Sequence, residues 1–136
     1  MTALTKERNT IRIEGQAHFP VPVAASVTCF TGAIACINTS GHATPGAATA
    51  SLRTLGRFEE TVTNGATAAA VNVLIQRGIF RFANSSSTDA ITIADRTNTC
   101  YVVDDQTVAK TSNSNARPVA GTVYDVDSDG VWVDMR

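Results

Sequence analysis

Three short apolar runs near the end of the chain decide the fold class: Cys100-Tyr-Val-Val-Asp104, Val119-Ala-Gly-Thr-Val-Tyr-Asp-Val126 and Val131-Trp-Val-Asp-Met135. Each run is rich in β-branched and aromatic residues, and turn residues such as Asp127-Ser-Asp-Gly130 separate them. Short strands with turns at intervals of roughly ten residues are typical of a small β-barrel or β-sandwich. No long stretch shows the helical period of 3.6 residues. The sequence therefore predicts an all-β fold.

Short apolar runs between turn residues also occupy the middle of the chain. Residues 27–38 predict one or two strands interrupted at Thr31-Gly32, and residues 39–46 predict a loop that reverses the chain. The run 52–62 contains Gly56, where a bulge or bend would turn a strand. These segments extend the β pattern towards the N-terminus.

Two further strand-like runs, Val71 to Gln76 and Ile79 to Ala83, follow a turn that we expect at Asn64-Gly65 with positive φ. In the second run, Phe80 and Phe82 lie at i and i+2 and therefore share one face of a strand. Because two aromatic rings bury a large area, we assign both phenylalanines to the core.

At most one short helix is expected. Residues 89–95 fit a short helix capped by Ser87 or Thr88, although their β-branched residues also permit a strand. Residues 111–117 are polar and predict a flexible loop.

The first residues differ from the rest, so we divide the chain into an extended N-terminal arm at residues 1–24 and a single β domain at residues 25–136. Two prolines favour an extended segment at a sheet edge or across a surface, because proline fixes φ and lacks a ladder donor. Apolar residues alternate here as if one face were buried. The candidate partner-contact residues are Phe19, Pro20, Val21, Pro22 and Val23.

Size and charge limit the classes of function. A chain of 136 residues suits one hydrophobic core. Its 11 basic and 12 acidic side chains give a net charge of −1, and the basic residues are scattered along the sequence. Direct nucleic-acid binding is disfavoured because phosphate neutralisation needs a concentrated basic patch. The sequence contains no membrane-span-length apolar run and no N-terminal apolar signal segment, so we expect synthesis and assembly in a cytoplasm, with no membrane partner.

The three cysteines, Cys29, Cys36 and Cys100, lie in apolar runs and show no Cys-x-x-Cys spacing. We interpret them as small buried hydrophobic side chains, with a disulfide or a reactive thiol as the alternatives.

The pattern Asp125-x-Asp127-x-Asp129-Gly130 matches the first half of an EF-hand calcium loop. The twelfth position of such a loop needs a bidentate glutamate, and Arg136 occupies it here. A hairpin turn explains the same residues, since aspartate and glycine favour tight turns. We therefore favour an acidic turn, with calcium binding as the alternative.

The sequence shows no catalytic grouping. The acidic pairs Glu59-Glu60 and Asp104-Asp105 lie in strand-like runs, where neighbouring side chains point to opposite faces. Neither His18 nor His42 has a carboxylate or cysteine pair in metal-ligand spacing. Nucleophile elbows, P-loops and dinucleotide fingerprints are missing from the sequence. We therefore expect no catalytic residues, no metal, no cofactor and a non-enzymatic protein.

Five stretches form a further pattern: Arg77-Gly-Ile-Phe-Arg-Phe-Ala-Asn-Ser85, Asp89-Ala-Ile-Thr92, Cys100-Tyr-Val-Val-Asp-Asp-Gln-Thr-Val-Ala109, Val119-Ala-Gly-Thr-Val-Tyr-Asp-Val-Asp127 and Gly130-Val-Trp-Val133. Together they resemble the decoration or cement proteins of tailed-bacteriophage and prophage heads. The resemblance extends over residues 50–135 and includes no catalytic motif.

This resemblance implies a β-rich protein that binds the outer surface of the head shell and stabilises it by bridging major capsid protein subunits. It also implies a virion location and a homo-oligomer, with a trimer expected first and a dimer second. The arm would reach over the shell and add a strand to an exposed sheet edge. Two alternatives stay open, namely a head-tail connector or tail component, and a calcium-binding β domain built around residues 125–129.

Overall fold

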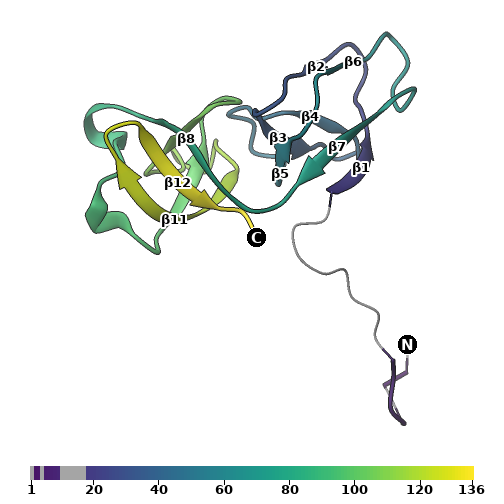
Figure 1. The fold of residues 1–136 in the computed structure, drawn as a ribbon, viewed down its shortest axis with the longest axis horizontal. Coiled ribbons are helices and arrows are strands. Elements are labelled where there is room, and N and C mark those ends of the chain that lie inside the picture. Colours follow the sequence, from purple (N-terminus) through teal and green to yellow (C-terminus); the bar gives the residue numbers. More distant parts are fainter. Residues whose placement is uncertain (1, 4, 10–17) are drawn as a thin grey trace.

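The computed structural model describes residues 2–3, 5–9 and 18–136 (Figure 1). Within these residues the strands form a five-stranded sheet, a closed five-stranded barrel and a two-stranded ribbon. The all-β prediction is therefore confirmed. The helix expected at residues 89–95 is replaced by two single 3-10 turns, η1 (Ser87–Asp89) and η2 (Ile93–Asp95).

The N-terminal sheet is antiparallel between all its neighbours. Its strands, in spatial order, are β1 (His18–Pro22), β7 (Asn72–Gln76), β5 (Arg53–Phe58), β3 (Ile34–Ile37) and β4 (Ala43–Pro45). The small ribbon pairs β2 (Thr28–Cys29) with β6 (Val62–Thr63). Buried apolar side chains of these strands form the first core, with Phe58 as its largest member.

The C-terminal barrel closes on itself. Its strands, in order, are β10 (Thr107–Ala109), β8 (Ile79–Asn84), β12 (Gly130–Asp134), β11 (Val119–Asp127) and β9 (Thr99–Val102). Only the β10–β8 pair is parallel among these. The three C-terminal strands predicted from the sequence are thus confirmed, and their inward side chains form the second core.

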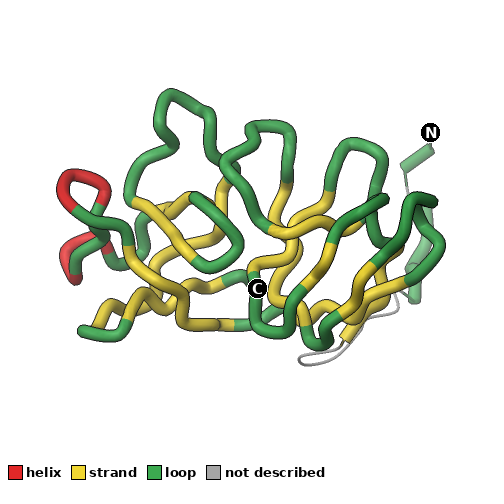
Figure 2. The backbone as a smooth tube through the Cα atoms, turned by 90° about the horizontal axis from the view of Figure 1, so that it is seen from above, coloured by secondary structure: helices red, strands yellow, loops and turns green. Residues whose placement is uncertain are grey.

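Strand β3 belongs to both cores. Ile34 and Cys36 pack into the barrel core, whereas Ala33 and Ala35 pack into the core of the N-terminal sheet. Successive side chains of a strand point to opposite faces, so one strand can serve as a wall between two cores. The sheet and the barrel consequently lie side by side (Figure 2), and β3 of the sheet supplies side chains to both cores.

The chain passes from sheet to barrel at Arg77-Gly78, between β7 and β8. The two strands predicted around this dipeptide are confirmed, and they belong to different sheets. Phe82 is buried in the barrel core, and Phe80 packs against that core while remaining partly buried. Both phenylalanines therefore face the core, as their spacing predicted.

Residues 18–23 are part of the N-terminal sheet, which corrects their assignment to an arm. Strand β1 pairs with β7 along its whole length, and Val21 and Val23 are buried in the sheet core. The boundary predicted between residues 24 and 25 falls directly after this strand. The paired residues of the two strands are at least fifty positions apart in the chain, so local patterns could not predict the pairing. The predicted arm at residues 1, 4 and 10–17 lies outside the described residues.

Gly56 forms the predicted bulge. Across the β3–β5 pair, Ala35 faces Gly56 and Cys36 faces Thr54, so Leu55 is the extra residue. Gly56 has φ of +155°, a conformation that side chains with a Cβ rarely adopt.

The turn predicted at Asn64-Gly65 is wrong in its conformation, because neither residue has positive φ. Asn64 is instead buried, and its amide nitrogen donates hydrogen bonds to the carbonyl oxygens of Val23, Ala24 and Thr67 at 3.0–3.1 Å. A tertiary contact with the end of β1 therefore decides the role of this asparagine.

The loop predicted at residues 39–46 is shorter than expected. Chain reversal occurs around Asn38, whose Oδ1 accepts hydrogen bonds from the backbone N–H groups of Ser40 and His42 at 3.0 Å. Residues 43–45 then form β4, at the edge of the sheet.

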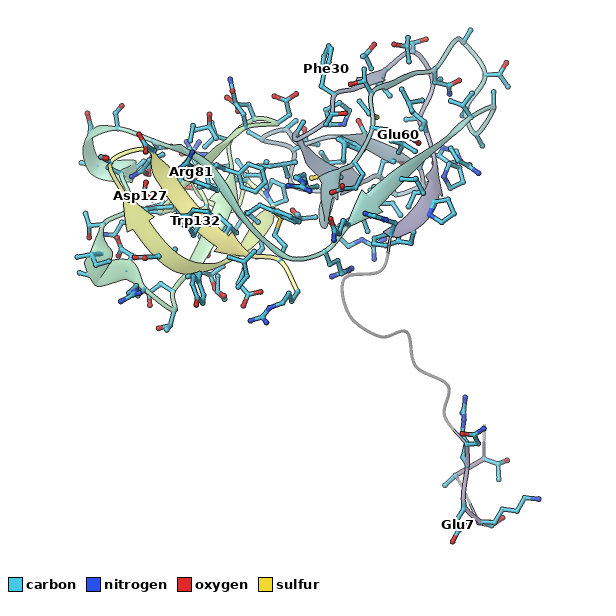
Figure 3. The ribbon with its side chains drawn as sticks, viewed as in Figure 1. Glu7, Phe30, Glu60, Arg81, Asp127 and Trp132 are labelled. Carbon is cyan, nitrogen blue, oxygen red and sulfur yellow. The ribbon has the colours of Figure 1, made fainter. Side chains whose placement is uncertain are left out.

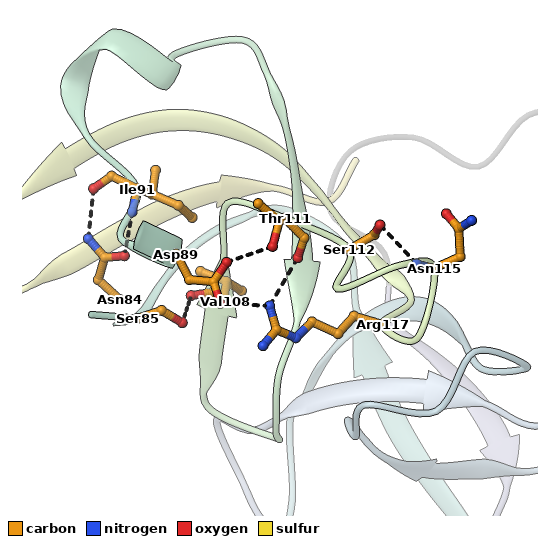
Figure 4. A network of polar contacts seen from close by, with 9 residues as sticks. All are labelled: Asn84, Ser85, Asp89, Ile91, Val108, Thr111, Ser112, Asn115 and Arg117. Carbon is orange, nitrogen blue, oxygen red and sulfur yellow. Dashed lines mark hydrogen bonds and ion pairs between the residues drawn. The ribbon is translucent and has the colours of Figure 1, made fainter. Parts of the chain in front are cut away.

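The segment 111–117, predicted as flexible, is held by side chains (Figure 4). The Asp89 carboxylate accepts hydrogen bonds from Thr111 Oγ1 at 2.6 Å and from Arg117 Nη1 at 3.3 Å. Arg117 Nη1 also donates to the Thr111 carbonyl at 3.1 Å. The hydrogen bond from Thr111, followed by the effects of Arg117, holds the pKa of Asp89 below its usual range although burial opposes this. These bonds tie the loop to η1.

Candidate interaction surfaces

Only every second residue of β1 forms backbone hydrogen bonds with β7. Val23 N–H donates to the Val71 carbonyl, so Val21 and Phe19, two and four residues earlier, also face β7. The backbone positions between them, Pro20 and Pro22, face the free edge of β1, which ends directly after Pro22, where the Ala24 N–H donates to the Ala43 carbonyl of β4 at 2.9 Å. Proline has no N–H group, so this edge offers no donor at either position.

The five predicted contact residues are divided between the core and the surface. Val21 and Val23 are buried and Phe19 packs partly buried against the same core, so these three side chains stabilise the chain itself. Only Pro20 and Pro22 are exposed. Contact with a partner through Val21 or Val23 is therefore excluded in the folded chain.

An exposed apolar face extends from the two prolines onto β7. Pro20 lies opposite Leu74, which is 38% exposed, and Pro22 lies opposite Asn72. We call these four residues the β1–β7 face. The sequence analysis missed Leu74, although the alternation along this run could have identified it. Val73 and Ile75 are the buried residues of β7, so Leu74 between them is an apolar side chain at a position where an exposed, polar one is expected.

Charged side chains lie next to this face. Glu59 Oε1 accepts hydrogen bonds from Arg57 Nε and Nη2 at 2.9 and 2.6 Å, and Glu59 Oε2 lies 3.6 Å from His18 Nε2. Glu60 Oε1 accepts a hydrogen bond from the backbone N–H of Leu74 at 3.1 Å. The neighbouring glutamates thus have different partners, although they lie in a bend directly after β5 and not in the strand assumed for them.

The acidic turn between β11 and β12 is organised around Asp127 (Figure 3). Its Oδ1 accepts hydrogen bonds from the N–H groups of Asp129 and Gly130 at 2.8 and 3.1 Å, and its Oδ2 accepts one from Trp132 Nε1 at 2.9 Å. The Trp132 hydrogen bond is the largest cause of a pKa for Asp127 below its usual range. Arg81 stacks on the Trp132 ring, 5.6 Å from its centroid.

The three aspartates of the EF-hand-like pattern have three different partners. Asp127 binds Trp132, while Asp129 lies 3.6 Å from Arg81 and Asp125 lies 3.6 Å from Arg96. Across residues 2–3, 5–9 and 18–136, no three histidine, cysteine or acidic side chains are grouped as metal ligands. The geometry is that of a hairpin turn held by Asx hydrogen bonds.

Cys29, Cys36 and Cys100 are buried and unpaired, which confirms their interpretation as hydrophobic side chains. Burial raises the pKa of the first two thiols to about 11 and that of Cys100 to about 12. The reactive form of cysteine is the thiolate, so these raised pKa values oppose the reactive-thiol alternative.

No known family model matches this chain, and searches of curated proteins and solved structures also give no match. Among the described residues, no helix has the length and apolar character needed to cross a membrane. The likeness to phage head proteins therefore depends on the sequence pattern, and function must be argued from the surfaces.

Proposed function

We propose that the chain is a non-enzymatic decoration protein of a tailed-bacteriophage head. It binds the outside of the shell and bridges neighbouring major capsid protein subunits. The observation that carries this proposal is the β1–β7 face, an exposed apolar surface on paired strands. Such a surface can dock onto a shell without the entropy cost of ordering a loop.

The free edge of β1 limits how that docking occurs. Strand addition requires alternating donors and acceptors along the edge, and Pro20 and Pro22 remove donors there. Contacts by side chains of the β1–β7 face therefore replace the strand addition expected from the sequence. Leu74 lies opposite Pro20 and is the largest aliphatic side chain of the face.

The body behind this face is stiff. The closed barrel has no free edge, and β3 joins the barrel core to the core of the sheet. A force that the shell exerts on the β1–β7 face is thus carried into the two cores, whose closely packed side chains deform little. This property suits a subunit that stabilises a shell under internal pressure.

The first experiment tests the face directly. Leu74→Asp places a charge in the proposed contact. We expect this variant to bind expanded shells of the phage's major capsid protein at least about tenfold more weakly than the wild type. Ile93→Asp is the matched control, because Ile93 is equally apolar, exposed and located on η2 of the barrel half. If both variants bind shells with equal affinity, the β1–β7 face does not contact the shell.

Deletion of the N-terminal segment must stop at residue 17, because a longer deletion would remove β1 and with it two core valines. We propose that the segment before His18 contributes to shell binding, so deleting residues 2–17 should weaken it. Thermal melts of both proteins separate lost binding from lost stability. Undiminished binding would remove this segment from the proposal.

Subunit counting on imaged particles tests the class of structural protein. A decoration protein occupies many equivalent positions over the shell, as trimers in our first expectation and dimers in our second. A connector or tail component would instead form one ring or one tube. A wild-type protein that stayed monomeric and bound no shell would refute the proposal.

A further inference from the structure

Four arginines that are distant in the sequence meet between the sheet and the barrel. Arg53 comes from β5, Arg77 from the β7–β8 connection, Arg117 from the residues before β11, and Arg136 from the residues after β12. They line an open groove of about 500 Å³ together with Val119 and other residues of both halves. We call it the arginine groove. Their proximity could not be predicted from the sequence, because these basic residues are far apart along the chain.

Two of the four guanidinium groups are not neutralised. Arg117 lies 3.3 Å from the Asp89 carboxylate, and Arg136 lies 2.9 Å from that of Asp134. Arg53 and Arg77 have no ion-pair partner within the part of the chain that the structure describes. The groove therefore presents positive potential, although the chain as a whole has a net charge of −1.

The arginine groove continues along the outer face of β11. Two neighbouring hollows, of about 530 and 480 Å³, share Asp134 with it and lead to Arg96 and Tyr124. We call the three hollows together the β11 trough. Its length along residues 119–124 is about 17 Å at the rise of an extended strand.

Two large apolar side chains are exposed in the trough. Val119 is 52% exposed and Tyr124 is 55% exposed. Tyr124 lies at a register shift of the β11–β12 pair, between Val123 and Asp125, and such bulges redirect a side chain. Because β11 is paired on both sides, with β9 and with β12, an occupant can bind only through side chains.

We propose that the β11 trough binds an extended acidic segment of a partner polypeptide. Carboxylates of the segment pair with Arg53 and Arg77, and its apolar side chains lie on Val119 and Tyr124. Charge complementarity and the alternation of positive and apolar groups favour this occupant. A nucleic acid fits less well, because a phosphate backbone carries a charge at every residue and needs a longer basic track than two unpaired arginines.

The identity of the partner rests on the proposed function: for a decoration protein, the acidic segment belongs to the capsid subunit. The trough itself does not depend on that function. A bridging subunit would then contact the shell at two places, the β1–β7 face and the trough, and two linked contacts raise avidity.

The test uses a fluorescent peptide of eight residues, Glu-Ser-Val-Ser-Glu-Ser-Val-Ser, which spans the trough in extended form and presents its glutamates and valines on the same face, because side chains two residues apart share a face. Fluorescence anisotropy should show binding to the full chain, weaker at higher salt because the charges are exposed. The double variant Arg53→Ala and Arg77→Ala should lose at least about tenfold in affinity. Arg81→Ala is the control, since Arg81 is exposed on β8 outside the trough. Its loss should leave the affinity for the peptide unchanged.

Equal affinity of the double variant and the wild type would overturn the proposal, provided that their thermal melts agree. A thymidine oligonucleotide that binds in place of the peptide, with the same dependence on Arg53 and Arg77, would also overturn it and assign the trough to nucleic acid. If the wild type binds the peptide and the double variant does not, the result supports the trough as the peptide-binding site. If the same variant still decorates shells normally, the capsid subunit is not the occupant, and the proposed function stands on the β1–β7 face.

Discussion

The open N-terminal sheet and the closed C-terminal barrel differ in how they treat strand edges. The barrel has every strand paired on both sides, whereas the sheet ends in β1 and β4, which are joined to each other only by an isolated bridge between Val23 and Ala43. Proline is found at both of these edges, as Pro20 and Pro22 in β1 and as Pro45 in β4. An unprotected edge invites pairing with another chain, and proline prevents it. The prolines therefore oppose strand addition at both edges, so in the proposed function we expect the sheet half to contact the shell with its face.

Both halves combine surface hydrogen bonds with one buried polar side chain among the described residues. In the barrel half, Asp89, Thr111 and Arg117 hold one long connection (Figure 4), and the buried Asp95 carboxylate accepts hydrogen bonds from the N–H and hydroxyl groups of Thr92. In the sheet half, the buried Asn64 amide donates to three carbonyl oxygens. An unsatisfied buried group is costly, so a substitution that removes the partners of Asn64 or Asp95 should destabilise its half more than one at an exposed polar position.

The largest expected effect lies where the two halves join. Ile34→Ala removes a fully buried side chain from β3 and should lower the free energy of unfolding by about 2–5 kcal/mol. Because β3 serves both cores, urea unfolding followed by Trp132 fluorescence, which reports on the barrel, should coincide with unfolding followed by circular dichroism. Ile93→Ala, at an exposed position, should change stability by less than about 0.5 kcal/mol. Two separate transitions would show that the halves fold independently.

A smaller effect is expected at the bulge of β5. In Gly56→Ala the new Cβ would collide with the Gln76 carbonyl of β7, and φ of +155° is strained for alanine, so we expect a loss of about 2 kcal/mol. Gly65→Ala is the control, because nothing lies within 4 Å of its Cβ position. Thermal or chemical melts measure both variants. A neutral Gly56→Ala would mean that the bulge is readily rearranged.

Local signals in the sequence predicted the barrel strands and the bulge. Cys100 to Asp104, Val119 to Val126 and Val131 to Met135 alternate and end at turn residues, and these features act over a few residues. Gly56 was identified for the same reason. Here local preference and tertiary structure agree.

Features that depend on distant partners could not be predicted in this way. The pairing of β1 with β7 and the hydrogen bonds of Asn64 to Val23 and Ala24 join residues that are at least forty positions apart. The arginine groove is likewise assembled from four separate segments. A single sequence records no such proximity, so Val21 and Val23 were interpreted as contact residues although they are core residues.

The edge of the sheet at β1 can be altered by replacing its two prolines, with a modest change in the free energy of unfolding. Replacing Pro20 and Pro22 by threonine restores two N–H donors on the free edge of β1, at a cost of about 0.4–1 kcal/mol each from the more flexible unfolded chain. We expect the double variant to associate through its sheet edges, as measured by light scattering and size-exclusion chromatography. Leu74→Thr is the control, since it introduces threonine on the same face and adds no backbone N–H donor to the edge. A double variant with the oligomeric state of the wild type would show that the prolines do not protect this edge.

The smallest effect concerns the acidic turn of the barrel, where Trp132, the only tryptophan of the chain, reports on Asp127. The hydrogen bonds from Trp132 and Asp129 lower the pKa of Asp127 in the folded state, so the stabilisation is present above the ordinary aspartate pKa of about 3.9. It is lost as pH falls through the lower folded-state value. Trp132 fluorescence should therefore change with a midpoint below about 3.9, and Asp127→Asn should abolish this step while Asp129→Asn retains it. A midpoint at or above the ordinary value would mean that the Trp132 hydrogen bond does not stabilise the carboxylate, and the turn would then be held by its backbone alone.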